Sequence, residues 1–223
     1  RSSDLQRKLC ANVSVKLSAF GLLINPELCD ALLHDLCFYA NEYQNFVRID
    51  MEDSQCTEDT IQLYLKLRQQ YQNTGIVLQA YLKRTADDIT RITQAGAGHF
   101  RLCKGIYIEP PEIAYNSVQS IRDNYLKCLR QMLTAGSFVG IATHDPWLVD
   151  EAKKLLLELN IPNTQYEFQM LLGVAEEMRQ DLVVSGHSLR VYVPYGYRWY
   201  EYSIRRLKEN PRIARYIIQN LFS

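Results

Sequence analysis

The sequence has no excess of charge of either sign and no long apolar run. Lys and Arg number 25 and Asp and Glu number 25 among the 223 residues, so the formal net charge is zero. Nucleic-acid binding needs a basic surface that neutralises phosphates, so we expect no nucleic-acid partner. No run reaches the roughly 18 apolar residues of a membrane span, and the first residues do not resemble a signal peptide. A soluble intracellular protein is expected.

Two further patterns are missing. The six cysteines form no CxxC pair, so we expect reduced, buried thiols in a cytosolic-type compartment. No GxGxxG sequence follows a strand pattern, and the dinucleotide fingerprint of an open doubly wound sheet is therefore absent.

What the sequence does contain is an alternation of strand and helix patterns. We expect strands at residues 12–18, 45–51, 75–81, 99–105, 137–145, 166–170 and 189–193. Helical patterns separate them, and this alternation favours a parallel sheet with right-handed crossovers. Because the doubly wound sheet lacks its fingerprint, we favour an α/β fold closed as a (β/α)8 barrel.

An eight-stranded barrel needs one strand more than these patterns supply. Residues 1–9 are too polar to form it and resemble the end of a helix. We therefore expect a single barrel domain over residues 1–223 that is N-terminally incomplete, with its first strand upstream or missing.

Capping signals mark several helix ends. Asn25 and Pro26 open a helix, because proline is favoured at the first helical position. Thr85 and Ser117 are expected N-caps, and Asp145 should cap the helix that begins after it. The first of these helices should bury a stripe formed by Leu28, Ala31, Leu32, Leu36 and Tyr39. A last amphipathic helix is expected over residues 211–222.

Polar side chains occur at or near the end of every expected strand. In a barrel these ends share one face, and active sites form there. The residues are Lys16, Asp50, Glu52, Gln79, Arg101, Lys104, His144, Glu167, Gln169 and Tyr192. Each alone has an ordinary structural explanation, but burying the whole set unpaired would cost several kcal/mol. A shared site is the better interpretation.

Two adjacent arginines, Arg205 and Arg206, follow the last expected strand. Planar guanidinium groups beside aromatic rings suit a flat anion such as a carboxylate. Spacing alone gives equal weight to a solvated helix face. Together with the lysines and arginine at the strand ends, the pair predicts a cationic mouth for an anionic substrate or a phosphorylated cofactor. Only His144 among the strand ends could supply an imidazole ligand, so no metal site is expected.

A series of motifs resembles the proline dehydrogenase family. They are VSVKLSAFG, RIDMED, VLQAYLKRT, RLCKGIY, IATHD, YEFQMLLG, and YVPYG followed by WYEYSIRRLKENP. The likeness covers essentially the whole chain in the family's order and is most specific in RLCKGIY, YEFQMLLG and SIRRLKEN. The chain is more similar to the monofunctional form than to the large bifunctional one. Ile106 departs from the small residue expected between Gly105 and Tyr107.

The resemblance implies a distorted (β/α)8 barrel that holds FAD non-covalently and binds L-proline. The residues it implies for the proline carboxylate are Lys16, Arg205 and Arg206. Those implied for the walls of the substrate pocket are Tyr107, Leu171, Tyr192 and Tyr202. Asp50 and Arg101 are implied at the catalytic centre, with Arg101 near flavin N5. Further flavin contacts are implied for Gln79, Lys104, His144, Glu167 and Gln169.

The implied reaction is the oxidation of L-proline to Δ1-pyrroline-5-carboxylate by hydride transfer from C5 to flavin N5. This is the first step of proline catabolism to glutamate, and the electrons would pass to a membrane quinone. The resemblance thus implies a cytoplasmic enzyme, at most peripheral on the inner face of a bacterial membrane, or on the mitochondrial inner membrane in a eukaryote.

Two other functions remain open at this point. One is a barrel enzyme of another class, such as an aldolase that forms a Schiff base on Lys16 or Lys104. The other is a non-catalytic relative or an inactive fragment, which the absent first strand suggests. A flavin absorption spectrum separates these possibilities.

Overall fold

A computed structural model describes residues 11–96 and 98–193 of the chain. The strands are β1 (Asn12–Lys16), β2 (Phe46–Asp50), β3 (Thr74–Gln79), β4 (His99–Cys103), β5 (Phe138–Ala142), β6 (Tyr166–Leu171) and β7 (Leu189–Tyr192). The helices are α2 (Pro26–Glu42), α3 (Ser54–Arg68), α4 (Thr85–Gln94), α5 (Val118–Thr134), α6 (Pro146–Glu158) and α7 (Glu176–Val184). A 3-10 turn, η1 (Leu17–Phe20), follows β1. Within these ranges, no helix combines the length and the apolar character that crossing a membrane requires.

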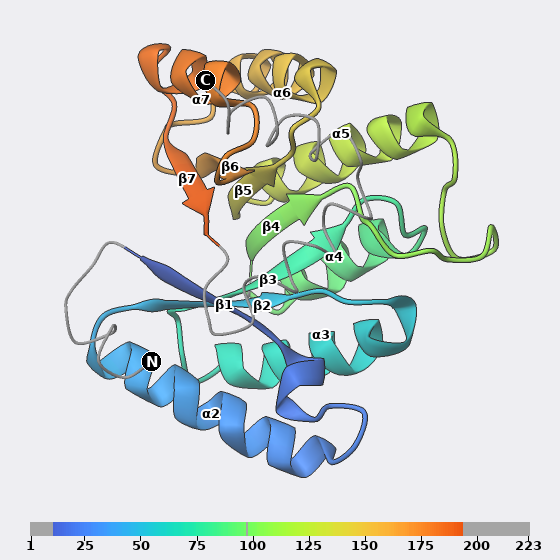
Figure 1. Cartoon of the computed structure of the whole chain (residues 1–223), viewed down its shortest axis with the longest axis vertical. Coiled ribbons are helices and arrows are strands. Elements are labelled where there is room, and N and C mark those ends of the chain that lie inside the picture. The colour runs from blue at the N-terminus through green and yellow to red at the C-terminus, as the bar shows by residue number, and fades with distance from the viewer. Residues whose placement is uncertain (1–10, 97, 194–223) are drawn as a thin grey trace, which may run out of the picture.

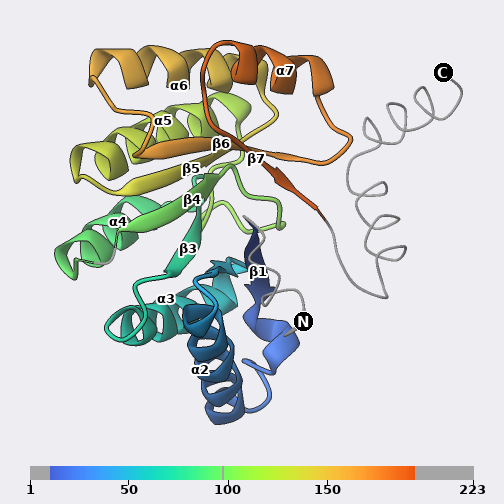
Figure 2. The same cartoon turned by 90° about the vertical axis from the view of Figure 1, so that its left-hand side faces the viewer.

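The strands form one parallel sheet whose order follows the chain from β1 to β7. The sheet is strongly curled (Figure 1), and the helices lie along its outer side (Figure 2). The described residues thus form a curled half-barrel of parallel strands and alternating helices. The predicted α/β barrel class is confirmed, as is the predicted set of strands.

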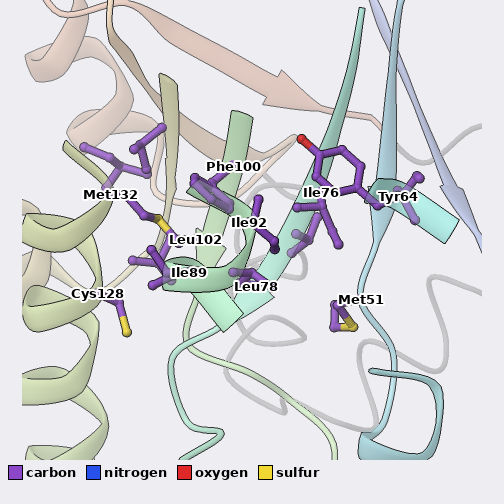
Figure 3. Close-up of a cluster of buried hydrophobic side chains, with 14 of the residues drawn as sticks. Met51, Tyr64, Ile76, Leu78, Ile89, Ile92, Phe100, Leu102, Cys128 and Met132 are labelled. Atoms are coloured by element: carbon purple, nitrogen blue, oxygen red, sulfur yellow. The ribbon is translucent and has the colours of Figure 1, made fainter. Parts of the chain in front are cut away.

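The hydrophobic core lies between the outer face of the sheet and the helices. Side chains alternate along a strand, so every second residue of β3 and β4 points outward into this layer. Figure 3 shows these strand residues beside those of α3, α4 and α5. The buried members of this cluster include Tyr64, Ile76, Leu78, Ile89, Ile92, Phe100, Leu102, Cys128 and Met132. The inner face of the sheet carries polar side chains such as Arg48 and Arg101 beside apolar ones such as Phe46.

The first strand is shorter than predicted. It ends at Lys16, and Ser18 lies in η1 rather than in the strand. The turn closes with Gly21 at φ 89°, a left-handed conformation that suits glycine. Ser18 donates from its backbone N and its Oγ to the Glu52 carboxylate at 2.9 and 2.6 Å, which ties this turn to the end of β2.

The predicted buried stripe of α2 is wrong except for Leu36, which is half-buried against the core. Leu28, Leu32 and Tyr39 are 51%, 43% and 54% exposed, and Ala31 is exposed as well. The buried row is the adjacent one, formed by Cys29, Leu33, Cys37 and Ala40. Both rows are apolar at helical spacing, so periodicity could not choose between them. The thiols and the methyl group are small, which allows the helix to approach the sheet closely.

The predicted cap of α4 is also wrong. Ser117 is the N-cap of α5, and its Oγ accepts from the Ser120 backbone N at 3.0 Å, as predicted. Thr85, in contrast, is the first residue of α4, and Arg84 occupies the cap position. The Thr85 hydroxyl instead donates to the Gln79 carbonyl oxygen at 2.6 Å, because that oxygen lies at the buried end of β3.

Candidate active site

Arg101 of β4 joins strands that are not its neighbours in the sheet. Its Nη1 donates to Asp50 Oδ1 of β2 at 2.8 Å, and its Nη2 donates to Ser14 Oγ of β1 at 3.1 Å. Its Nε donates to Gln169 Oε1 of β6 at 2.5 Å. None of these strands lies next to β4. The bonds therefore cross the inside of the curl and define the centre of the candidate site.

Asp50 is the carboxylate of this centre. Its side chain is 12% exposed, and burial raises its pKa, an effect that the charges of Arg101 and Lys16 only partly offset. The Tyr192 hydroxyl, at the end of β7, donates to Asp50 Oδ2 at 3.5 Å. The Arg101 guanidinium also lies 5.4 Å from the centroid of the Tyr192 ring. The ends of β2, β4 and β7 thus meet at one point.

Lys16 ends β1 beside Tyr107, which lies in the segment between β4 and α5. Its ammonium group donates to the Tyr107 hydroxyl at 3.1 Å. Burial alone would lower the pKa of Lys16, but Tyr107 and the Asp50 and Glu52 carboxylates together raise it. Lys16 is therefore a fixed cation at physiological pH.

Glu167 and Gln169 lie on the inner face of β6, where Gln169 bonds to Arg101. The Gln169 amide nitrogen donates to Glu167 Oε1 at 2.6 Å, and Arg190 Nε of β7 donates to the same oxygen at 2.6 Å. Glu167 is the second residue of β6, so it does not stand at a strand end as the sequence suggested. It is deeper in the curl because the strand continues to Leu171.

Gln79 ends β3 and connects it to the end of β2. Its amide nitrogen donates to the Glu52 carbonyl oxygen at 2.7 Å. Glu52 in turn accepts from Ser18 through its carboxylate. These bonds hold the chain segments after the first three strands together, so the position of the Gln79 amide is fixed by backbone groups.

Lys104 takes part in a second ionic cluster at the rim. Asp145 accepts from Lys104 Nζ at 3.2 Å and from Arg122 of α5 through both oxygens, at 2.9 and 2.8 Å. Burial alone would raise the pKa of Asp145, but these cations lower it. Asp145 occupies the cap position of α6, yet its side chain does not cap the helix, contrary to the sequence prediction. The carboxylate binds the two cations instead.

His144 precedes this aspartate and faces the end of β6. Its Nε2 accepts from the Leu171 backbone N at 2.9 Å, which leaves the ring proton on Nδ1. Burial and then the charges of Lys104 and Arg179 lower the His144 pKa, so the imidazole is neutral. Leu171 pairs in register with Tyr192, so both occupy neighbouring strand ends. Among the described residues, no three His, Cys, Asp or Glu side chains are placed to hold a metal ion.

The structure brings most of the described candidate residues to one edge of the curl and adds others. Ser14, Asp145 and Arg190 contact predicted residues but did not appear among the site candidates, and Arg122 joins the site through its bonds to Asp145. Ser14 and Arg190 share the inward-facing parity of Lys16 and Tyr192 on their strands, and this alternation could have identified them. Arg122 lies on a helix, where no sequence signal distinguished it from a surface residue.

Three predicted substrate residues, Tyr202, Arg205 and Arg206, lie outside the described residues, as do the expected turn after β7 and the last helix. Their roles stay predictions. The described part of the mouth is also less cationic than the sequence suggested, because Asp50 and Asp145 each pair with its cations.

The sequence was compared with known families and proteins. The family model for proline dehydrogenase matches residues 2–217. The chain is 37% identical over 205 residues to proline dehydrogenase 2 of Bacillus subtilis strain 168, covering 92% of this chain and 67% of that protein. It is 35% identical over 214 residues to proline dehydrogenase of Deinococcus radiodurans, covering 94% of this chain and 69% of the relative.

A solved structure resembles the fold over most of the chain. It is proline utilization A from Bdellovibrio bacteriovorus inactivated by N-propargylglycine, with a TM-score of 0.81 and 28% identity. The match covers 89% of this chain but 24% of the solved one, so this chain corresponds to about a quarter of that protein.

Proposed function

Because the chain belongs to the proline dehydrogenase family, we propose that it oxidises L-proline to Δ1-pyrroline-5-carboxylate as the first step of proline catabolism. The observation that supports this most is the meeting of Lys16, Asp50, Arg101 and Tyr192 at one edge of the sheet. These are residues that the family resemblance implies for substrate and catalysis. Residues 1–223 are proposed to form one domain of this enzyme.

The donor set of this edge fits the FAD cofactor that we propose. A flavin needs hydrogen-bond donors and acceptors around its ring system and cations near its phosphates. Arg101 has five N–H groups and uses three of them in the bonds described, which leaves donors for a ligand. The Nδ1 proton of His144 is a further donor. Gln79, Lys104, His144 and Arg101 are proposed to hold the cofactor, with Asp50, Glu167 and Gln169 supporting them.

A bound FAD would supply the hydride acceptor for C5 of proline. The protein would fix the substrate, since holding reactants in a productive geometry removes several kcal/mol from a barrier. Lys16, as a fixed cation, is proposed to bind the proline carboxylate with Arg205 and Arg206. Tyr107, Leu171, Tyr192 and Tyr202 are proposed as the pocket walls. Arg101 would stabilise negative charge that develops at the reacting centre.

The electron acceptor is proposed to be a membrane quinone. The enzyme would then work at a membrane surface as a peripheral protein, on the inner face in a bacterium or at the mitochondrial inner membrane in a eukaryote. L-Proline is the proposed small-molecule partner, and no nucleic-acid partner is proposed.

An absorption spectrum tests cofactor and substrate together. The purified protein should show a flavin spectrum, and L-proline added without oxygen should bleach it. D-Proline is the matched control and should bleach it much more slowly. Flavin that L-proline does not bleach would contradict the proposed substrate, and a protein that takes up no FAD would contradict the proposed cofactor.

The Schiff-base alternative is disfavoured by the two lysines themselves. A Schiff-base lysine needs a neutral amine, which requires a lowered pKa. The Lys16 pKa is raised, and Lys104 is ion-paired with Asp145. An aldolase would be colourless and would be trapped by borohydride with its substrate, so the same preparation can test it.

A further inference from the structure

Four buried or half-buried side chains form a continuous series of hydrogen bonds inside the half-barrel. Arg190 donates to Glu167, Gln169 donates to the same Glu167 oxygen, and Arg101 donates to Gln169. Glu167, Gln169 and Arg101 are 7%, 4% and 9% exposed, so bulk water hardly competes for these bonds. The series of hydrogen bonds begins at Arg190 of β7, passes through Glu167 and Gln169 of β6, and ends at Arg101 of β4, which bonds to β1 and β2.

The two ends of the Gln169 amide face different partners. Its nitrogen donates to Glu167, and its oxygen accepts from Arg101 Nε. An amide can rotate by half a turn and exchange these ends, so something must select one orientation. A carboxylate only accepts hydrogen bonds and a guanidinium only donates them, so Glu167 requires the nitrogen end and Arg101 requires the oxygen end. The two partners therefore select the same orientation of the amide.

A glycine in β5 provides the room for this arrangement. A Cβ atom at Gly140 would lie 2.4 Å from the Gln169 amide nitrogen and 2.7 Å from its Cδ. The amide is held at both ends, so it cannot move away without losing a hydrogen bond. The Gln169 amide can therefore adopt its position only because residue 140 has no side chain.

We propose that Glu167 is a positioning residue that orients the Gln169 amide and, through it, the Arg101 guanidinium at the site. Arg190 keeps the Glu167 carboxylate in place, and Gly140 makes room for the amide. This proposal deepens the proposed function, because it assumes that Arg101 works at the reacting centre. It gives Glu167 an indirect role, whereas the family resemblance suggested a contact with the cofactor.

Glu167→Gln tests the proposal without a large change in shape. A glutamine at 167 is neutral and can present either end of its amide, so the Gln169 nitrogen loses its charged acceptor and only Arg101 still selects the orientation of Gln169. The signal to follow is the NMR resonance of the Arg101 Nε–H group in the purified protein, assigned by its loss in Arg101→Lys. We expect this resonance to shift and its proton to exchange faster with water in Glu167→Gln and in Gly140→Ala.

Glu158→Gln is the matched control. Glu158 is also an arginine-paired carboxylate, but it pairs with Arg130 on the surface, where the two side chains are 60% and 47% exposed. The Arg101 resonance should not change in this variant. An unchanged Arg101 resonance in both Glu167→Gln and Gly140→Ala would overturn the proposal, and this result does not depend on whether the protein oxidises proline.

A double-mutant cycle tests the same idea in turnover. Glu167→Gln should lower kcat about tenfold, the effect of one weakened hydrogen bond to a charged group. In an Arg101→Met background it should lower kcat no further, because Glu167 would act only through Arg101. Equal losses in both backgrounds would contradict the proposal. Absence of proline oxidation in the unsubstituted, FAD-loaded protein, with the NMR shift present in the variants, would contradict only the proposed function.

Discussion

Lys16 keeps its proton because of the groups that surround its ammonium. Burial opposes the charge, but the Tyr107 hydroxyl and two carboxylates outweigh burial and raise the Lys16 pKa. Lysine is otherwise easily neutralised when it is buried. The phenol of Tyr107, which lies in the segment after β4, thus helps to keep Lys16 charged and able to bind an anion.

The first prediction concerns that phenol. Tyr107→Phe removes the oxygen that accepts from Lys16 Nζ at 3.1 Å and keeps the ring. The lysine then loses one fixed partner, so KM for proline should rise about tenfold while kcat changes less. Steady-state kinetics measure both constants.

Tyr115→Phe is the control for this variant. The Tyr115 ring lies 5.9 Å from Lys83 Nζ, a contact that phenylalanine retains. Its KM should equal that of the unchanged protein. If Tyr107→Phe also leaves KM unchanged, Tyr107 does not hold Lys16 for the substrate.

At the scale of helices and strands, α3 and α4 are joined by one carboxylate. Glu58 of α3 accepts from Arg84 Nη2 at 2.6 Å and from Arg91 Nη1 at 2.7 Å. The bond from Arg84 has the largest effect and the bond from Arg91 the next largest, and together they lower the Glu58 pKa from 4.5 to about 2. The side chain is 42% exposed, so solvent screens the pairing and its contribution to stability is modest.

This lowered pKa gives a pH-dependent prediction. A carboxylate with a lowered pKa in the folded state contributes stability above its unfolded pKa and loses it as the pH falls. Glu58→Gln should therefore lower the urea midpoint at pH 7, and the difference from the unchanged protein should vanish near pH 2. Asp59→Asn, at the exposed neighbouring position, should show no such loss at pH 7. A constant difference at both pH values would contradict the assignment.

For the molecule as a whole, the inside of the curl is unusual because it buries several charged side chains. Barrel interiors are commonly filled with branched apolar residues. Here Arg48 is fully buried on β2, and burial followed by the charge of Arg101 lowers its pKa to about 9. Its guanidinium lies 4.9 Å from the Phe46 ring centroid, and its Nη1 donates to the His99 carbonyl oxygen at 3.2 Å. The curl closes tightly around this arginine.

Gly75 of β3 is the residue that permits this closure. A Cβ atom there would lie 2.5 Å from Arg48 Nη1 and 2.9 Å from the His99 carbonyl oxygen. Gly75→Ala should therefore cost about 2 kcal/mol of unfolding free energy, the usual size of an overpacked interior. Urea unfolding measures the loss.

The reason for that loss can be checked in a second background. In Arg48→Met the planar guanidinium is gone, so Gly75→Ala should cost clearly less than in the unchanged protein. An equal cost in both backgrounds would show that the clash with Arg48 is not responsible.

The amino-acid sequence was enough to predict the order of strands and helices, the barrel class and the family, because these depend on local alternation and on motifs within short stretches. It also identified Lys16, Asp50, Arg101 and Tyr192, since each stands at or near the end of a strand pattern. Each strand pattern lies within a few residues of the site residue that it identifies.

Which polar groups meet depends on the three-dimensional fold, and the sequence did not predict it. Arg101 bonds to Ser14, 87 residues away, and to Asp50, 51 residues away, because the sheet curls. The fold also determines that α2 buries the row containing Leu33, and that Glu167 lies near the start of β6 and not at its end. Each choice depends on partners from distant elements, and local periodicity carries no information about them.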